Sequence, residues 1–163
     1  MYDTAVDAEQ LIIRPRDVTD NAMPSGNSLA ADLLFHLGDL YDNAAYRAIA
    51  AVISSSAVPV LSKYPAAFGH LLGVIDSQVY GATEVALVSR SRDTSFNVLE
   101  EAVASAYVPS LVIAASGTAD SEIVLLRNRD ALEGKATAYV CRGYVCEAPV
   151  TSAAELIAQL DDL

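Results

Sequence analysis

Two cysteines near the end of the chain are the residues best suited to covalent chemistry. Cys141 and Cys146 are five positions apart, on either side of Arg142 and Gly143. On an unbroken strand this odd spacing would place the two side chains on opposite faces of a sheet. A turn or bulge at Gly143 could bring them together, because glycine tolerates the backbone dihedrals required. A redox pair and two small buried apolar residues are both open, and the rarity of cytosolic disulfides favours the second.

A dense polar cluster lies near the N-terminus. Its candidate substrate-binding side chains are those of Asp17, Asp20, Asn21, Ser25 and Asn27. Such groups could hydrogen-bond sugar hydroxyls, and either aspartate could serve as acid or base in glycoside chemistry. The same residue types are the usual choice for a helix N-cap and a turn. Both interpretations stay open, and no residue is assigned as catalytic.

The remaining chemistry-bearing residues do not assemble into a pattern. His36 and His70 lie on predicted helices far from the cysteines in sequence, so we expect no metal site and no histidine base. The chain also lacks the glycine-rich phosphate-binding motifs. We therefore expect no cofactor.

Helical periodicity dominates the chain up to about residue 80. Apolar residues recur at helical spacing from about residue 25, again over 44–61 and again over 66–79. We expect the first two helices to form an antiparallel hairpin with its turn at Asp42 and Asn43. Pro59 should kink the second helix or end it early, and Gly81 should close the third.

The period changes after Gly81. A strand at about 84–89, a helix at 95–106 and a strand at 111–115 predict a βαβ unit with parallel strands. Residues 122–126 fit either a strand or a short helix, and residues 136–140 fit a further strand. Thr151 or Ser152 should cap the last helix, with Glu155 completing a capping box from Ser152.

These patterns predict an α/β protein in two parts. A helical segment occupies residues 1–80, and a small α/β module with a short, mainly parallel sheet occupies residues 81–163. Hydrophobic residues make up 53% of the chain and charged residues 19%, which is enough apolar material for a folded core.

Charge and hydropathy argue against two classes of partner, nucleic acids and membranes. The formal net charge is −11, and no basic stripe offsets it, so we expect neither nucleic acid nor an anionic membrane as partner. No stretch reaches the roughly 20 continuous apolar residues of a membrane span. The N-terminal residues do not read as a signal peptide, so a cytoplasmic location is expected. The abrupt start at Tyr2-Asp3-Thr4 suggests a piece cut from a longer chain.

Three segments together resemble the C-terminal region of the YyaL / spermatogenesis-associated protein 20 family. They are residues 14–28, with the sequence Pro-Ser-Gly-Asn-Ser at their end; Tyr-Pro-Ala-Ala-Phe at 64–68; and residues 137–151, which hold both cysteines and end in Pro-Val-Thr. In order and spacing the resemblance covers nearly the whole chain. The helices between these segments would be generic alone.

The resemblance implies a larger parent protein. Members of the family begin with a thioredoxin-like domain, followed by a helical toroid similar to those of six-hairpin glycosidases and N-acylglucosamine 2-epimerases. This chain would hold the last helices of the toroid and a terminal α/β piece. Its expected partners are the rest of the parent chain and, through an exposed helical face, a second copy of itself.

Three functions remain open. The chain could be a non-catalytic docking or stabilising part of its parent. It could contribute sugar-binding residues from the Asp17 to Ser28 region to a carbohydrate-active enzyme. It could also have a redox-linked role through Cys141 and Cys146. Likeness of fold alone does not choose among them, and whether the chain is an enzyme stays undecided.

Overall fold

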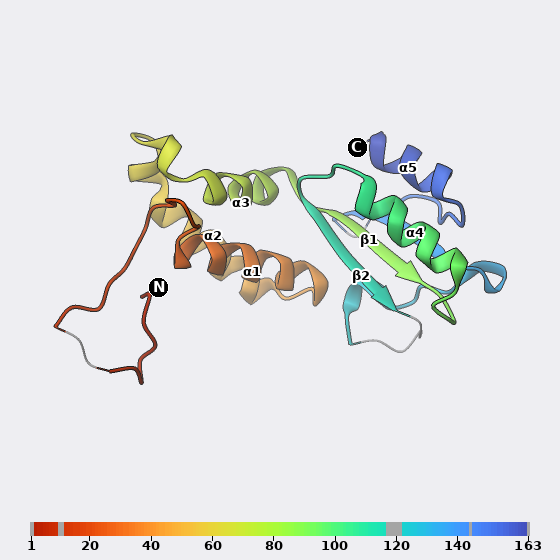
Figure 1. Ribbon diagram of the computed structural model, residues 1–163, viewed down its shortest axis with the longest axis horizontal. Helices are drawn as coiled ribbons and strands as arrows, with labels where there is room; N and C mark the ends of the chain where they lie inside the picture. Colours follow the sequence, from red (N-terminus) through yellow and green to blue (C-terminus); the bar gives the residue numbers. More distant parts are fainter. Residues whose placement is uncertain (1, 10–11, 117–121, 144, 163) are drawn as a thin grey trace. The chain divides into compact units, whose positions relative to one another are not determined.

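The chain folds into two compact units, each with its own hydrophobic core. A computed structural model describes residues 2–9, 12–116, 122–143 and 145–162 (Figure 1). The first unit comprises residues 1–38 and 43–80. The second comprises residues 81–163 and the connection 39–42.

The described part of the first unit contains three α-helices. They are α1 (Gly26–Leu40), α2 (Ala44–Leu61) and α3 (Gly69–Tyr80), and a short 3-10 turn, η1 (Pro65–Ala67), precedes α3. Their core consists of the buried side chains of Ala31, Phe68, Leu71 and Val74, with Ile53, Ala57 and Leu61 packed against it. The apolar spacing in the sequence therefore located these helices correctly.

The two ends of α2 show which local sequence signals set the bounds of the helix. The Asn43 side chain accepts hydrogen bonds from the amides of Ala45 and Tyr46, at 3.0 and 3.3 Å, which caps the helix start. The helix runs through Pro59 to Leu61, so the expectation that Pro59 would end it early was wrong. Pro59 lies in the last turn and is exposed, so water can satisfy the one carbonyl that it leaves unpaired.

The second unit is built on a four-stranded sheet with the order β2-β1-β3-β4. Strand β1 (Thr83–Val88), helix α4 (Thr94–Ser105) and strand β2 (Leu111–Ser116) form the predicted unit, and the two strands are parallel. Gly81, with φ at +84°, separates α3 from β1, as expected for a glycine that ends a helix. The α/β class and the parallel βαβ unit are confirmed.

The rest of the sheet is antiparallel. Strand β3 (Thr137–Arg142) runs antiparallel to β1, and β4 (Val145–Cys146) runs antiparallel to β3. The sheet is thus mixed, where the sequence suggested a mainly parallel one. A third parallel strand would need another long crossover, whereas the described residues before β3 form only the 3-10 turns η2 (Val124–Leu126) and η3 (Leu132–Gly134). Within residues 122–126, left open between strand and short helix, Val124–Leu126 form a short 3-10 helix, so the helical alternative is the observed one.

Two helices cover one face of this sheet. Helix α5 (Ala153–Asp161) packs beside α4, and their apolar side chains meet those of β1 and β3. The main contributors are Val85, Leu87, Phe96, Leu99, Val103, Val140, Leu156 and Leu160. Ser152 caps α5 as predicted: its Oγ accepts a hydrogen bond from the Glu155 amide at 3.4 Å and donates one to the Glu155 carboxylate at 2.6 Å.

Among the described helices, α2 alone is long and apolar enough to cross a membrane, judged by length and composition. One such helix is weak support for a membrane span, because core helices of water-soluble proteins pass the same test.

Candidate functional site

Asp20 joins the starts of two helices. One carboxylate oxygen, Oδ1, accepts a hydrogen bond from the Ser25 amide at 2.8 Å, just before α1. The other, Oδ2, accepts from the amides of His70 and Leu71, both at 3.0 Å, in the first turn of α3. Its own amide donates to the carbonyl of Ala67 at 2.8 Å. Asp20 therefore satisfies amides that would otherwise lack partners at two helix ends.

This environment keeps Asp20 ionised. Partial burial opposes ionisation, but hydrogen bonds from the Ser25 amide, the Ser28 hydroxyl and the amides of Leu71 and His70 outweigh it. Together they hold the pKa of the Asp20 carboxyl below its ordinary value of 3.8. A carboxylate with these properties is a poor proton donor near neutral pH.

Two more of the predicted polar residues have structural partners. The Ser25 hydroxyl accepts a hydrogen bond from the Ser28 amide at 3.1 Å and lies 2.9 Å from the Ser28 hydroxyl, and both serines are buried. Asn27, also buried, donates from its side-chain amide to the carbonyl of Asp17 at 2.8 Å. These contacts match the capping role that was weighed against sugar binding.

Asp17 and Asn21 are placed differently. Both are exposed, and the Asp17 carboxylate accepts hydrogen bonds from the Thr19 amide and hydroxyl, both at 3.2 Å. They border an open hollow of about 450 Å³ lined by Asp3, Asp17, Asn21, Ala22, Met23, Pro24, Ser25 and Gly26. Three of the five predicted residues thus line one pocket, whereas Asp20 and Asn27 do not.

The histidines are brought together by an aspartate that the sequence analysis did not single out. On α1, Asp32 Oδ1 lies 3.0 Å from Nδ1 of His36, one helical turn later. Its other oxygen lies 3.1 Å from Nε2 of His70 on α3, at ion-pair distance although the geometry is not that of a hydrogen bond. Among the described residues, no group of three or more His, Cys, Asp or Glu has an arrangement that could hold a metal ion.

The two cysteines form a disulfide. Cys141 on β3 faces Cys146 on β4 in the antiparallel register, and a turn at Gly143, with φ at +53°, connects the strands. The favoured interpretation, two small buried apolar residues, was therefore wrong, because Gly143 reverses the chain and brings the cysteines together. Cys141 is buried, with 2% of its surface exposed, whereas Cys146 is exposed.

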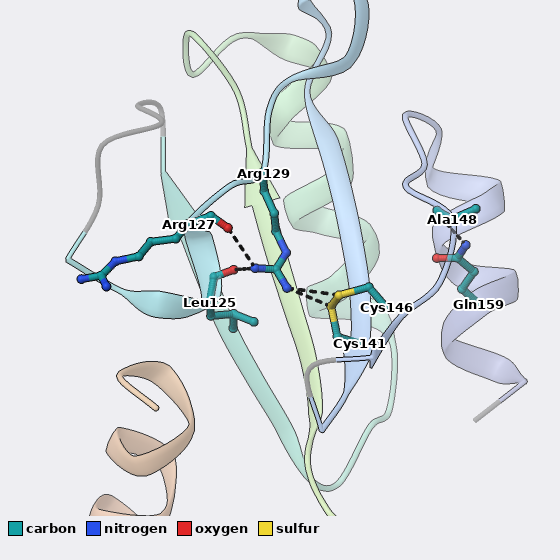
Figure 2. Close-up of a disulfide and its surroundings, with 7 residues drawn as sticks. All are labelled: Leu125, Arg127, Arg129, Cys141, Cys146, Ala148 and Gln159. Carbon is teal, nitrogen blue, oxygen red and sulfur yellow. Dashed lines mark hydrogen bonds between the residues drawn. A yellow bond between two sulfur atoms is a disulfide. The ribbon is translucent and has the colours of Figure 1, made fainter. Parts of the chain in front are cut away.

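A guanidinium group lies against both sulfur atoms. Nη2 of Arg129 is 3.3 Å from Sγ of Cys141 and 3.1 Å from Sγ of Cys146 (Figure 2). Nη1 donates to the carbonyls of Leu125 and, at 3.5 Å, Arg127. The guanidinium carbon also lies 5.7 Å from the centre of the Tyr139 ring. The backbone carbonyls thus hold the charge in place beside the disulfide.

Arg129 was not predicted as a site residue, because no local motif marks it. It precedes Cys141 by twelve residues, and the intervening chain makes the turn η3 before it enters β3. Asn128 has a positive φ of +57°, a conformation that asparagine tolerates better than most residues. A lone Asn-Arg pair before a strand gives no sequence signal of a contact with sulfur.

Comparison with known proteins identifies relatives but no solved structure. The chain is 26% identical over 151 residues to spermatogenesis-associated protein 20 of Homo sapiens, and 24% identical over 151 residues to that of Rattus norvegicus. Each alignment covers 90% of this chain and 19% of the relative. The chain is thus a distant homologue of spermatogenesis-associated protein 20. The resemblance inferred from its motifs is confirmed.

The match to spermatogenesis-associated protein 20 is limited in extent. The chain spans about a fifth of the length of these curated relatives. No model of a protein family matches the sequence. No solved structure is significantly similar to it.

Proposed function

We propose that this chain is a non-catalytic part of a longer protein, in which further helices cover the exposed face of α2. The parent would combine a helical toroid of the six-hairpin glycosidase type with a thioredoxin-like domain, as the family resemblance implies. The activity would belong to that larger assembly.

The composition of the exposed face of α2 carries this proposal. Ile49, Val52 and Val60 lie on one side of the helix, by its 3.6-residue period, and are each at least 42% exposed. The only charged residue of the helix, Arg47, is half-buried and donates to the carbonyl of Gly38 at 2.6 Å. An 18-residue helix with such an uncharged outer face is typical of one that packs on two sides.

The remaining observations agree with a packing role. The half-buried side chain of Asp20 and the buried side chains of Ser25 and Asn27 are engaged in helix caps and loop contacts. The chain also corresponds to only 19% of its relatives' length, which leaves ample sequence to supply covering helices.

A charge placed on α2 tests the proposal. Val52→Glu should lower the melting temperature of the full-length protein clearly, because the new carboxylate would be buried without a partner. In the 163-residue chain the same change should have little effect, since Val52 is 66% exposed there. Val98→Glu on α4, at a site that is 45% exposed, is the matched control. Equal responses of full-length protein to both changes would contradict a covered α2.

The hollow beside Asp17 supports a second function, the binding of a carbohydrate. Carboxylates of Asp3 and Asp17, the Asn21 amide and the apolar Met23 side chain line it, and sugar sites combine such groups. Saturation-transfer NMR with a panel of neutral monosaccharides tests this. Asp17→Asn should weaken a signal that Asp76→Asn, an exposed change on α3, leaves intact. Full-length protein that binds no member of the panel would exclude the idea.

A further inference from the structure

We propose that Cys141 and Cys146 form an exchange-active disulfide, which a dithiol reduces, and that Arg129 favours the reduced state. This role is independent of the packing proposed for α2. One guanidinium nitrogen of Arg129 contacts both sulfur atoms.

The two sulfur atoms differ in access. Cys146 is exposed and borders a hollow of about 350 Å³ lined by Arg127, Asn128, Arg129, Tyr139, Cys146, Glu147 and Pro149. Cys141 is 2% exposed. An incoming thiolate therefore reaches Sγ of Cys146, and Cys141 is the leaving group.

The exchange balances without any further reactant. The first thiolate of the dithiol attacks Sγ of Cys146, which forms a mixed disulfide and releases Cys141 as a thiolate. The second thiol of the reductant, once deprotonated, attacks its own bridging sulfur and releases Cys146. The protein gains two electrons, the reductant becomes a disulfide, and the two protons of the reductant pass to the released sulfurs or to solvent.

Strand pairing selects a dithiol over a monothiol. Cys141 stays opposite Cys146 through the pairing of β3 with β4, so the released thiolate can attack the mixed disulfide again and expel a monothiol. A dithiol escapes this reversal because its second thiol completes the reaction within the same complex.

Arg129 should stabilise the reduced state of the cysteine pair more than the oxidised state. A disulfide sulfur is a weak hydrogen-bond acceptor, whereas a thiolate accepts a charge-assisted bond from a guanidinium. The contact at 3.1–3.3 Å therefore becomes stronger on reduction, and cationic neighbours are known to stabilise thiolates. Two acidic side chains nearby act in the opposite direction when ionised: the buried Glu84, which lies on β1 opposite Cys141 on β3, and Glu147 at the hollow. Of these charges, Arg129 is the one in contact with both sulfurs.

Redox titration of the 163-residue chain tests the proposal. The protein is equilibrated in mixtures of reduced and oxidised dithiothreitol, and free thiols are counted by alkylation and mass spectrometry. Arg129→Gln should lower the equilibrium constant for reduction about tenfold, because the charge-assisted bond to the thiolate is lost. Arg129→Lys, which keeps the charge, should fall between the two.

Arg127→Gln is the matched control. Arg127 belongs to the same loop, but its guanidinium donates to the carbonyl of Glu122 at 3.2 Å and points away from the disulfide (Figure 2). This change should leave the equilibrium constant within about twofold of wild type, since the side chain makes no contact with sulfur. Equal effects of the Arg127 and Arg129 changes would overturn the role of Arg129.

A measurement on the wild-type chain tests the exchange activity of the disulfide even if the Arg129 variants fail to fold. In a dithiothreitol buffer with the oxidised form in large excess, the disulfide should open measurably, whereas structural disulfides stay oxidised in such a buffer. Dithiothreitol should also reduce it faster than an equal thiol concentration of 2-mercaptoethanol. A disulfide that stays fully oxidised in the dithiothreitol buffer would overturn the proposal.

Discussion

The carboxylate of Asp20 accounts for much of the polar cluster near the N-terminus. It accepts hydrogen bonds from three backbone amides at the starts of α1 and α3. A residue that the sequence offered for acid–base chemistry therefore has a structural role. Its hydrogen bonds satisfy amides that helix geometry leaves without partners. The exposed Asp17, by contrast, retains the access that a ligand would need.

Removal of Asp20 should destabilise the first unit. Asp20→Ala is expected to lower the free energy of unfolding by about 2 kcal/mol, because three hydrogen bonds to a charged acceptor are lost. Asp17→Ala, at an exposed site, should change it by less than about 0.5 kcal/mol. Urea denaturation followed by circular dichroism measures both. A loss for Asp17→Ala as large as that for Asp20→Ala would argue against the capping role.

The lowered pKa of Asp20 gives this stabilisation a pH dependence. The ionised form is favoured in the folded state, so its contribution is fully present above the unfolded value, near 3.8. It is lost as pH falls through the lower folded pKa. The stability advantage of wild type over Asp20→Asn should therefore be constant near neutral pH and shrink in acid below pH 3.8. Denaturant titrations at several pH values would show this, and an advantage that grew in acid would contradict it.

At the scale of elements, two glycines should respond to alanine with opposite signs. Gly143 adopts a positive φ of +53° in the turn before β4, so Gly143→Ala should cost about 1 kcal/mol through backbone strain. Gly73 lies within α3 with open space around its Cα, so Gly73→Ala should stabilise by up to about 1 kcal/mol. Thermal denaturation of both variants tests this. Effects of the same sign would show that the environment of one glycine has been misjudged.

Most elements were predictable because their signals are local. The apolar spacing of α1 to α3, the Asn43 turn and the Ser152 cap each involve residues within one or two helical turns. Strand direction is not a local property. The sequence could not show that β3 runs antiparallel to β1, because the strand direction depends on the direction in which the chain leaves the turns η2 and η3.

At the scale of the whole molecule, apolar surface and net charge act against each other. The exposed face of α2 favours self-association, whereas a net charge of −11 makes copies of the chain repel. Added salt screens the repulsion but leaves apolar burial in place.

Association of the 163-residue chain should therefore rise with ionic strength. Light scattering at increasing sodium chloride concentration should show a growing mean mass for wild type and a smaller rise for Val52→Glu, which adds charge to the α2 face. A mass that falls with salt would point to ion pairs as the contact. A monomer under all conditions would leave α2 without a role in self-association.

The sequence by itself determined the helices, the βαβ unit, most caps and the resemblance to spermatogenesis-associated protein 20, because each depends on short-range patterns or on motifs kept in order along the chain. It also limited the chemistry to two clusters, around Asp17 to Ser28 and at the cysteines.

Tertiary structure decided which residues those clusters contact. Asp20 accepts hydrogen bonds from the amides of His70 and Leu71, some fifty residues later, and Arg129 contacts both sulfurs from outside the hairpin. Contacts between residues so far apart arise from packing and strand pairing, which no local pattern encodes. For that reason the partners of both clusters could be assigned only from the fold.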